Sequence, residues 1–142
     1  MEDFGSAVGL EHTEREALVT QRIGQAAFKR GVTRYWSGRC CVTGISESAL
    51  LRASHIRDWA RCNSDRERLT VFNGLLLAAH VDAAFDAGLV TFDETGTMLI
   101  SKGISASTRS ALGLVTPVRI RKLTNRHNEN LVWHRQNKFV DR

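Results

Sequence analysis

The feature that most limits how this chain can fold is a run of leucines that leads without a break into a run of alanines. Leu75, Leu76 and Leu77 are apolar but too few to form a helix of their own. Residues 78–85 follow directly, and their alanines favour a helix. We therefore expect a short apolar segment to run straight into a helix.

Short strands are expected on both sides of this junction. The last two of them flank residues 93–96, Asp-Glu-Thr-Gly, which form a β-hairpin signature. Gly44 ends the first expected strand, residues 39–43. The expected strands are residues 39–43, 51–55, 89–92 and 98–100. Strands mixed with helices in this order predict the α+β class.

Helical spacing and capping signals predict four helical segments. The first begins at a capping box, Thr13 to Glu16, and Gly31 is a natural stop for it. In the last segment, Leu131, Val132 and Phe139 are expected to pack against the core. The expected helical segments are residues 13–31, 32–36, 105–112 and 128–140.

Length and composition favour one compact domain. Of the 142 residues, 42% are hydrophobic, which suits a single core. Residues 1–12 have few apolar anchors, so we expect a flexible N-terminal arm there and one domain over residues 13–142. No apolar run approaches the roughly 20 residues needed to span a bilayer, and the first ten residues do not resemble a secretory signal.

The cysteines point to a reducing compartment. There are three, Cys40, Cys41 and Cys62, an odd number with two adjacent, which is a poor disulfide framework. We expect the three thiols to be buried or neutral. We also expect the protein to be cytoplasmic and to have no membrane partner.

The charge balance favours an anionic partner. Twenty Lys and Arg against 15 Asp and Glu leave a net charge of +5, and nucleic acid is the commonest anionic partner of a small basic domain. A basic surface without a specific partner fits this balance equally well. Two basic stretches are candidates for phosphate contact, and a solvated surface is the alternative for each. The first holds Arg57, Arg61, Arg66 and Arg68, and the second holds Arg119, Arg121, Lys122 and Arg126.

Three short segments carry residues suited to phosphodiester hydrolysis, which needs a base, a cation and a rigid frame. His55 lies at the end of an expected strand, and imidazole is the only side chain that serves unperturbed as a base near neutral pH. Asn73 supplies a carboxamide. His80 and Asp82 offer nitrogen and oxygen ligands at the start of the expected helix, which suit magnesium, manganese or a softer divalent ion.

The order and context of these segments resemble the HNH (ββα-metal) nuclease family. The matching stretches are residues 54–59 (Ser-His-Ile-Arg-Asp-Trp), 73–77 and 80–88, with further likeness at 22–29, 41–45 and 130–139. The resemblance implies a pocket, formed by a β-hairpin and a helix, that holds one catalytic divalent ion. It implies that His55 is the general base and that Asn73 braces the hairpin and helps to orient the imidazole. Here the ββα-metal core would be joined by an N-terminal helical segment, an additional β-hairpin and a C-terminal helix.

Two departures from the commoner family pattern concern metals. The resemblance implies metal ligands at the start of the helix and just before the base, but Ser54 before the base is a poor ligand that would act only through water. Three of the four ligands of the structural zinc that many relatives carry are missing, so no structural zinc is expected. Counting from the zinc-ligand positions of the commoner pattern places Asp82 where that pattern has its catalytic metal ligand. The branch of the family that this sequence resembles more closely has a histidine at the position of His80. Both stay candidates, with His80 placed first.

The sequence therefore predicts a DNA endonuclease that uses one divalent ion, Mg²⁺ or Mn²⁺, with Ni²⁺ or Co²⁺ as alternatives. A DNA-binding module that kept the fold and lost activity is the main alternative, and a zinc-stabilised interaction domain is disfavoured. Relatives with this arrangement are restriction or anti-phage effector domains, and a homodimer or a fused specificity domain fits that role. Asp86 and His134 are expected to be structural. The nucleic-acid contacts that we single out are Arg57, Arg61, Arg119 and Arg121.

Overall fold

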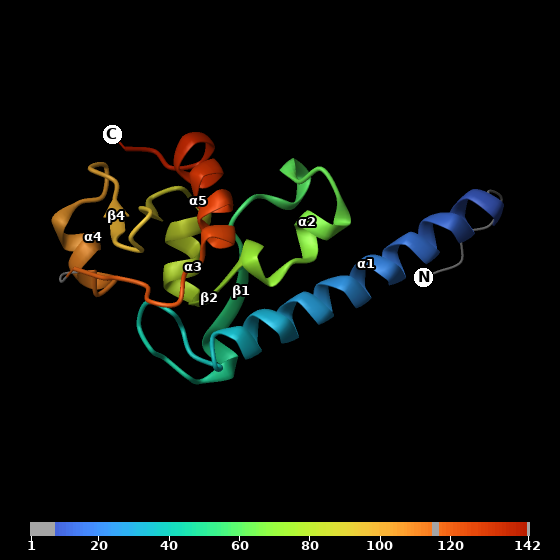
Figure 1. Cartoon of the computed structure of the whole chain (residues 1–142), viewed down its shortest axis with the longest axis horizontal. Helices are drawn as coiled ribbons and strands as arrows, with labels where there is room; N and C mark the ends of the chain where they lie inside the picture. Colours follow the sequence, from blue (N-terminus) through green and yellow to red (C-terminus); the bar gives the residue numbers. More distant parts are fainter. Residues whose placement is uncertain (1–7, 115–116, 142) are drawn as a thin grey trace.

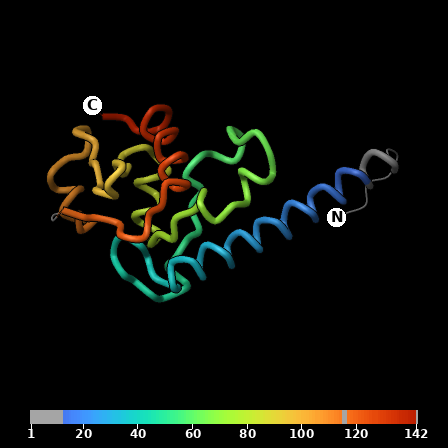
Figure 2. Tube along the Cα trace, viewed as in Figure 1, coloured from blue at the N-terminus to red at the C-terminus, as the bar shows by residue number. Residues whose placement is uncertain are grey.

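The first helix, α1, is one continuous element of 28 residues, Val8–Tyr35. The computed structural model describes residues 8–114 and 117–141. In Figures 1 and 2 the N-terminal part of α1 extends away from the other elements, and its C-terminal part packs against them. The expected start at Thr13 is wrong, because residues 8–12 are already helical and their carbonyls can accept the N–H groups that a capping box would satisfy. The rest of the expected arm, residues 1–7, lies outside the described residues.

The expected stop at Gly31 is also wrong, because α1 continues to Tyr35 and includes the short helical piece expected at residues 32–36. Gly31 serves packing instead. A Cβ built at this position would lie 2.8 Å from Cγ1 of Val71, so only a glycine lets the helix approach that side chain.

The centre of the fold is a two-stranded antiparallel sheet that leads into a short helix. β1 (Leu51–His55) pairs with β2 (Gly74–Ala78), with His55 opposite Gly74. All five residues of β2 are buried, which accounts for the unbroken leucine run. α3 (Ala79–Asp86) follows β2 without a loop. The expected junction and the α+β class with a ββα core are confirmed.

The strand expected at residues 39–43 is absent, and these residues form a turn beside β2. The backbone N–H groups of Val42 and Thr43 donate to Sγ of Cys40, at 3.4 and 3.3 Å. The N–H of Cys41 donates to the carbonyl of Leu76 at 2.9 Å. Because the thiol takes N–H groups that a strand would offer to a neighbouring strand, the segment turns and does not extend.

The polar segment between the two strands folds into three short helical turns. They are two 3-10 turns, Trp59–Arg61 and Val71–Asn73, on either side of α2 (Asp65–Leu69). The Ser64 side chain caps α2 by accepting the N–H of Glu67 at 3.2 Å. This segment forms one wall around the end of β1.

The second half of the chain adds the expected hairpin and two helices. β3 (Val90–Phe92) pairs with β4 (Met98–Ile100), and α4 (Ala106–Ala111) and α5 (Asn125–Asn137) follow. Leu131 packs in the core as expected, but Val132 is 39% exposed and Phe139 lies beyond the end of α5. The buried face of α5 is formed by His127, Leu131 and His134, whose spacing leaves Val132 on the outer side.

One hydrophobic core joins these elements. It runs from the C-terminal part of α1 across both sheets to α5 and includes Val32, Leu75, Phe85, Phe92 and Leu131. Within residues 8–114 and 117–141, no helix is both long enough and apolar enough to cross a membrane.

Candidate active site

His55 lies at the C-terminal end of β1 against two aromatic rings. The Phe28 ring of α1 stacks on the imidazole at a centroid distance of 4.1 Å and an interplanar angle of 6°. The Trp59 ring meets the imidazole edge-on at 5.5 Å. Gly74, opposite His55 in the sheet, permits this arrangement, because a Cβ there would lie 2.8 Å from Cζ of Phe28. Packing therefore holds the imidazole in one plane.

The backbone fixes one nitrogen of the imidazole. Nε2 of His55 lies 3.0 Å from the carbonyl oxygen of Arg68. A carbonyl can only accept, so Nε2 carries the proton and neutral His55 presents its lone pair on Nδ1. Burial lowers the pKa of His55 and outweighs the Arg68 carbonyl and the Asp58 charge, which both raise it. The imidazole is therefore neutral at neutral pH and can accept a proton.

The imidazole borders a hollow of about 390 Å³, which we call the His55 hollow. Its lining combines one imidazole, one carboxylate, one amide and two cationic side chains, contributed by α1, β1 and α3. The lining residues are Gln25, Phe28, Lys29, Leu51, Arg52, Ala53, His55 and Asp82.

α3 contributes Asp82 to the His55 hollow and places His80 elsewhere. Asp82 is half-buried, and within the described part of the chain its carboxylate has no hydrogen bond or ion pair. His80 stands two residues earlier, about 200° away around the helix, and is exposed. Of the two candidate metal ligands, Asp82 is thus the one that shares a hollow with the imidazole.

Asn73 clamps the chain that leaves β1. Its side chain is fully buried, Oδ1 accepts the N–H of Arg57 at 2.8 Å, and Nδ2 donates to the Arg57 carbonyl at 3.2 Å. The Asn73 carbonyl also accepts the N–H of Ile56, at 2.9 Å. These bonds fix the two residues that follow His55, and so fix the direction in which the imidazole leaves the strand.

Ser54 is 6% exposed and does not line the His55 hollow. Successive side chains of a strand point to opposite faces, so Ser54 and His55 leave β1 on different sides. The structure thus brings His55 and Asp82 to one hollow, and leaves Ser54 and His80 outside it.

The segment that carries this arrangement also matches a known family. Residues 40–93 match the HNH endonuclease family. The matched segment, called the HNH segment below, covers less than half of the 142 residues but contains the whole ββα unit with His55, Asn73 and Asp82. Among curated proteins, none matches the chain. The match indicates nuclease activity in general, with nucleic acid as the substrate.

The HNH segment offers donors that suit a divalent ion that keeps most of its water. Mg²⁺ binds proteins through one or two carboxylates together with substrate phosphate oxygens. Asp82 provides one unbonded carboxylate in the His55 hollow. Within the described residues, no three His, Cys, Asp or Glu side chains form a group that could hold a metal. The residues present therefore fit a hydrated ion shared with a phosphate.

The arginines singled out from the sequence lie at three separate places. Arg57 lines a cleft between the segment that follows β1 and α5. Arg61 is exposed on the 3-10 turn Trp59–Arg61. Arg119 and Arg121 line a different cleft, beside residues 39–44.

Arg68, in the same basic stretch as Arg57, has a structural role. Its Nε donates to the carbonyl of Trp59 at 3.0 Å, and its Nη2 donates to the carbonyl of Cys62 at 3.3 Å. The guanidinium also lies over the Trp59 ring. Since the Arg68 carbonyl accepts from His55, these bonds hold the wall of the site in place.

Asp86 and His134 both lie outside the His55 hollow. Asp86 accepts a hydrogen bond from Nζ of Lys138 at 3.1 Å, and the same ammonium bonds to Asp58 at 2.6 Å. His134 is buried in the core, 1% exposed. Each is thus bound to other parts of the protein, in line with the expected structural roles.

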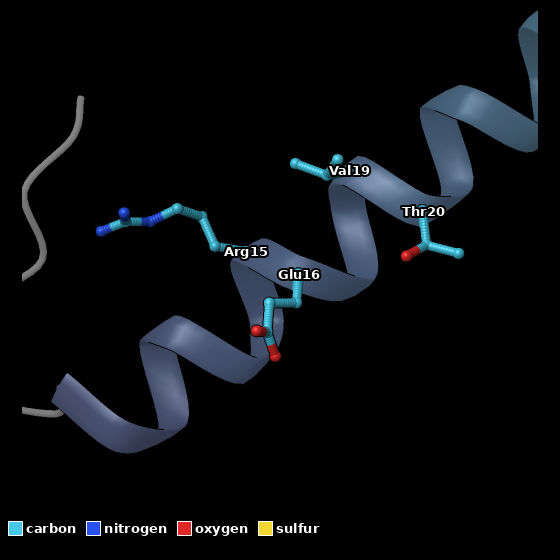
Figure 3. A pocket seen from close by; sticks show the side chains of 4 residues that line it. All are labelled: Arg15, Glu16, Val19 and Thr20. Atoms are coloured by element: carbon cyan, nitrogen blue, oxygen red, sulfur yellow. The ribbon is translucent and has the colours of Figure 1, made fainter.

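A larger hollow of about 520 Å³ lies on α1 alone. Figure 3 shows its lining, Arg15, Glu16, Val19 and Thr20, all carried by the N-terminal half of that helix. None of these four residues is a histidine, and none of them lies on a strand. The His55 hollow is therefore the better candidate in spite of its smaller volume.

Sequence patterns did not single out Phe28, Lys29 or the Arg68 carbonyl. A usable signal for α1 was present, because Gly24 and Gly31 stand seven residues apart and so share one helix face with Phe28 between them. Small residues on one face mark a helix that packs closely. No side-chain pattern could have indicated a backbone carbonyl.

Proposed function

We propose that the chain is a metal-dependent endonuclease that hydrolyses DNA phosphodiester bonds, with His55 as general base. One observation carries this proposal: a neutral imidazole with a defined tautomer lines the same hollow as an unbonded carboxylate and two cations. The buried His134, by contrast, has both ring nitrogens bonded and lines no such hollow. The HNH family match supports the same class of reaction.

In this mechanism, Nδ1 of His55 takes a proton from a water molecule as the water oxygen attacks phosphorus. The bond from phosphorus to the 3′-oxygen then breaks, and the departing oxygen takes a proton from solvent. His55 becomes an imidazolium whose Nε2–H still donates to the Arg68 carbonyl, so the hydrogen bond that selects the tautomer also stabilises the product charge. Asn73 keeps the strand end in position throughout.

Two cationic side chains of the hollow suit the phosphate oxygens. Lys29 comes from α1 and Arg52 from β1, and both are exposed at the rim. Nη1 of Arg52 donates to the carbonyls of Ala49 and Leu51, at 3.2 and 2.9 Å, which limits its motion. Cations held beside the base stabilise the negative charge that develops on the phosphate.

Asp82 is the residue that we propose as metal ligand, in place of His80, because it lines the hollow of the base. A divalent ion bound there would supply positive charge against the phosphorane-like transition state. A carboxylate ligand suits Mg²⁺ or Mn²⁺, whereas an imidazole ligand such as His80 would favour Ni²⁺ or Co²⁺. Ser54, on the other face of β1, is not part of this proposed set.

A second surface suits the DNA backbone. Arg119 and Arg121 share a cleft of about 410 Å³ with Arg39 and Lys122, and no carboxylate lines it. Three of these cations are positioned by carbonyls: Arg39 by Gly44, Arg119 by Thr95 and Lys122 by Tyr35. Cations without acidic neighbours attract phosphates and make binding depend on salt.

The alternative is a DNA-binding module with an HNH fold and no activity. The single carboxylate in the His55 hollow, with Ser54 in place of an acid, is the observation in its favour. For an active enzyme we propose a restriction or anti-phage role in the cytoplasm, with a homodimer or a fused domain selecting the target.

A cleavage assay tests the proposal. Supercoiled plasmid is incubated with the protein in Mg²⁺, in Mn²⁺ and in chelator, followed by a panel of modified, unmodified, single-stranded and double-stranded DNA and by RNA. We expect metal-dependent nicking of DNA that His55→Ala abolishes. Binding of DNA without cleavage in either metal would establish the inactive module, and cleavage of RNA alone would overturn the choice of substrate.

A further inference from the structure

The two basic stretches of the sequence meet in one cleft. Arg57 and Arg66 belong to the segment between the strands, and Arg126 belongs to the first turn of α5. All three line a cleft of about 210 Å³, together with Thr70 and Phe72. We call it the triple-arginine cleft. It is separate from the His55 hollow, with which it shares no lining residue.

The three guanidinium groups are unneutralised. Within the described part of the chain, none of them forms an ion pair, and Nε of Arg57 is buried without any hydrogen-bond partner. A buried N–H with no acceptor costs free energy comparable to a lost hydrogen bond. An anion bound in the cleft would balance part of the positive charge of the three guanidinium groups.

Aromatic rings preorganise two of the arginines. The Arg126 guanidinium lies over the Phe72 ring, 4.3 Å from its centroid, and the Arg57 guanidinium lies over Trp133 at 5.9 Å. Stacked guanidinium groups lose less rotamer freedom when they bind, and their planar N–H groups match phosphate oxygens. The N-terminus of α5 adds the positive end of a helix dipole on the same side.

Two carboxylates also line the cleft and reduce its net charge. Glu67 is engaged, because its Oε1 accepts the N–H of Asn63 at 2.7 Å, and Glu129 is exposed on α5. Three cations against two anions leave the cleft with a net positive charge, which favours one phosphate group in close contact with the guanidinium groups. A volume of 210 Å³ holds one phosphate group and a few waters, each of which takes about 30 Å³ in the liquid.

We propose that the triple-arginine cleft binds a backbone phosphate of the nucleic acid, one that is distinct from the phosphate hydrolysed at His55. This inference rests on the proposed function for the identity of the ligand. Since Asn73 clamps the backbone of Arg57, two residues after His55, a phosphate in the cleft sets the position of the strand relative to the base. The cleft is a positioning site.

Binding measured without divalent metal tests the cleft independently of cleavage. Anisotropy of a labelled DNA duplex is recorded against salt for the wild type, Arg66→Ala, Arg126→Ala and Glu129→Gln. Lys102→Ala, which removes an exposed cation that lines none of these clefts, is the matched control. Each lost phosphate contact reduces the slope of log affinity against log salt by about 0.9. We expect Arg126→Ala and Arg66→Ala to show that reduction, Glu129→Gln to tighten binding, and the control to keep the wild-type slope.

A second measurement keeps the test valid if a variant is unstable. The side-chain Nε–H resonance of Arg57 in the wild-type protein is followed by NMR during titration with the duplex and, separately, with inorganic phosphate. A saturable shift with the duplex supports the proposal. No shift while the duplex binds elsewhere overturns it, and so does saturation by inorganic phosphate with no response to the duplex. If the cleft fails this test but the protein still cleaves plasmid, the proposed nuclease function stands without the cleft. If the Arg57 resonance shifts as expected but no plasmid is cleaved, the cleft stands as a phosphate site and the nuclease proposal fails.

Discussion

Two histidines of this molecule have nearly the same packing and different surroundings. His55 stacks on Phe28 at 4.1 Å, and His134 stacks on Phe85 at 3.9 Å, each with the two rings within 6° of parallel. Each also places Nε2 3.0 Å from a backbone carbonyl, of Arg68 and of Phe85 respectively. Both imidazoles are therefore held in plane and in the same tautomer.

The difference lies at the other nitrogen. Nδ1 of His134 is 2.8 Å from the hydroxyl of Thr91, which donates to it, and the side chain is 1% exposed. Nδ1 of His55 has no partner in the described residues, and the ring lines a hollow with Asp82. Stacking and a carbonyl bond thus fix both rings, and the second nitrogen is what distinguishes them: it is bonded in His134 and free to accept a proton in His55.

The largest expected effect is on catalysis at His55. His55→Ala should lower the rate of DNA cleavage by about 100-fold to 10,000-fold, because a general base is lost, while the fold is kept. Plasmid nicking measures the rate, and circular dichroism measures the fold. Thr91→Val, which frees Nδ1 of the other histidine, should leave cleavage within a few-fold of wild type at a temperature where it is folded. Cleavage by His55→Ala at a rate close to that of the wild type would show that His55, like His134, has no role in the reaction.

The metal ligand gives the next largest effect. Asp82→Asn should reduce cleavage on the order of 100-fold at ordinary Mg²⁺, because charge stabilisation by a bound metal is worth several kcal/mol. His80→Ala, an exposed change on the same helix turn, should change it much less. Titrating both variants with Mg²⁺ and with Mn²⁺ measures the effect. The reverse order, with His80→Ala the more damaging, would place the metal away from the hollow of the base.

At the second histidine we expect an effect on stability. His134→Ala should lower the free energy of unfolding by about 2–4 kcal/mol, because it empties a buried site and leaves the Thr91 hydroxyl without its partner. The Phe85 carbonyl also loses the imidazole but still accepts the N–H of Gly88. Urea denaturation measures this change. Cleavage by the folded fraction should be unaffected, and a specific loss of activity without loss of stability would contradict the structural role.

The pH dependence of stability tests the two buried histidines, His127 and His134. Burial lowers the pKa values of His134 and His127 to about 4, from an unfolded value of 6.5. The unfolded chain therefore binds protons that the folded chain does not, and the free energy of unfolding falls as pH drops from 6.5 toward 4. Each histidine can contribute up to roughly 3 kcal/mol to this fall. In His134→Gln the slope measured by denaturation across this window should be smaller, and an unchanged slope would mean that His134 is protonated in the folded state.

The smallest effect expected concerns the cleft of Arg119 and Arg121. Replacing both with alanine should lower the salt dependence of DNA binding by about 0.9 log units per lost contact and leave the metal dependence of cleavage unchanged. Anisotropy titrations over a range of salt concentrations measure it. An unchanged slope would show that these side chains are solvated surface.

Sequence patterns predicted the ββα centre because the signals there are local. The strand that ends at His55 and the helix that begins at the alanines form where expected. The leucine run, which was expected only as a short apolar segment, forms β2. The prediction of a hairpin around residues 93–96 is confirmed for the same reason, since its turn signal is also local. Gly31 failed as a helix stop because its role depends on a tertiary contact with Val71. Residues 39–43 failed as a strand because the Cys40 thiol accepts the N–H groups of Val42 and Thr43, a local interaction that alternation of side chains does not reveal.

Only part of the candidate site could be identified from the sequence, because the rest depends on how distant segments pack together. His55, Asn73 and the pair of His80 and Asp82 stand in a recognisable order, so the sequence could identify them as candidates. It could not tell which of the pair shares a hollow with His55, because that depends on how α3 is rotated against β1. The convergence of Arg57, Arg66 and Arg126 from two distant stretches is likewise a property of the tertiary fold.

The stacking of Phe28 on His55 bears on where this nuclease unit can be cut for engineering. The family match begins at residue 40, so a fragment chosen by homology would contain His55 but not the aromatic ring that it stacks on. In such a graft Gly74 would face an open space where α1 had been. The imidazole would keep the Arg68 carbonyl and Trp59 as neighbours but lose the stacked ring that holds its plane. A transplantable cassette must therefore carry the C-terminal turns of α1, and shuffling of the bare ββα segment between proteins would succeed only where the host supplies an equivalent ring.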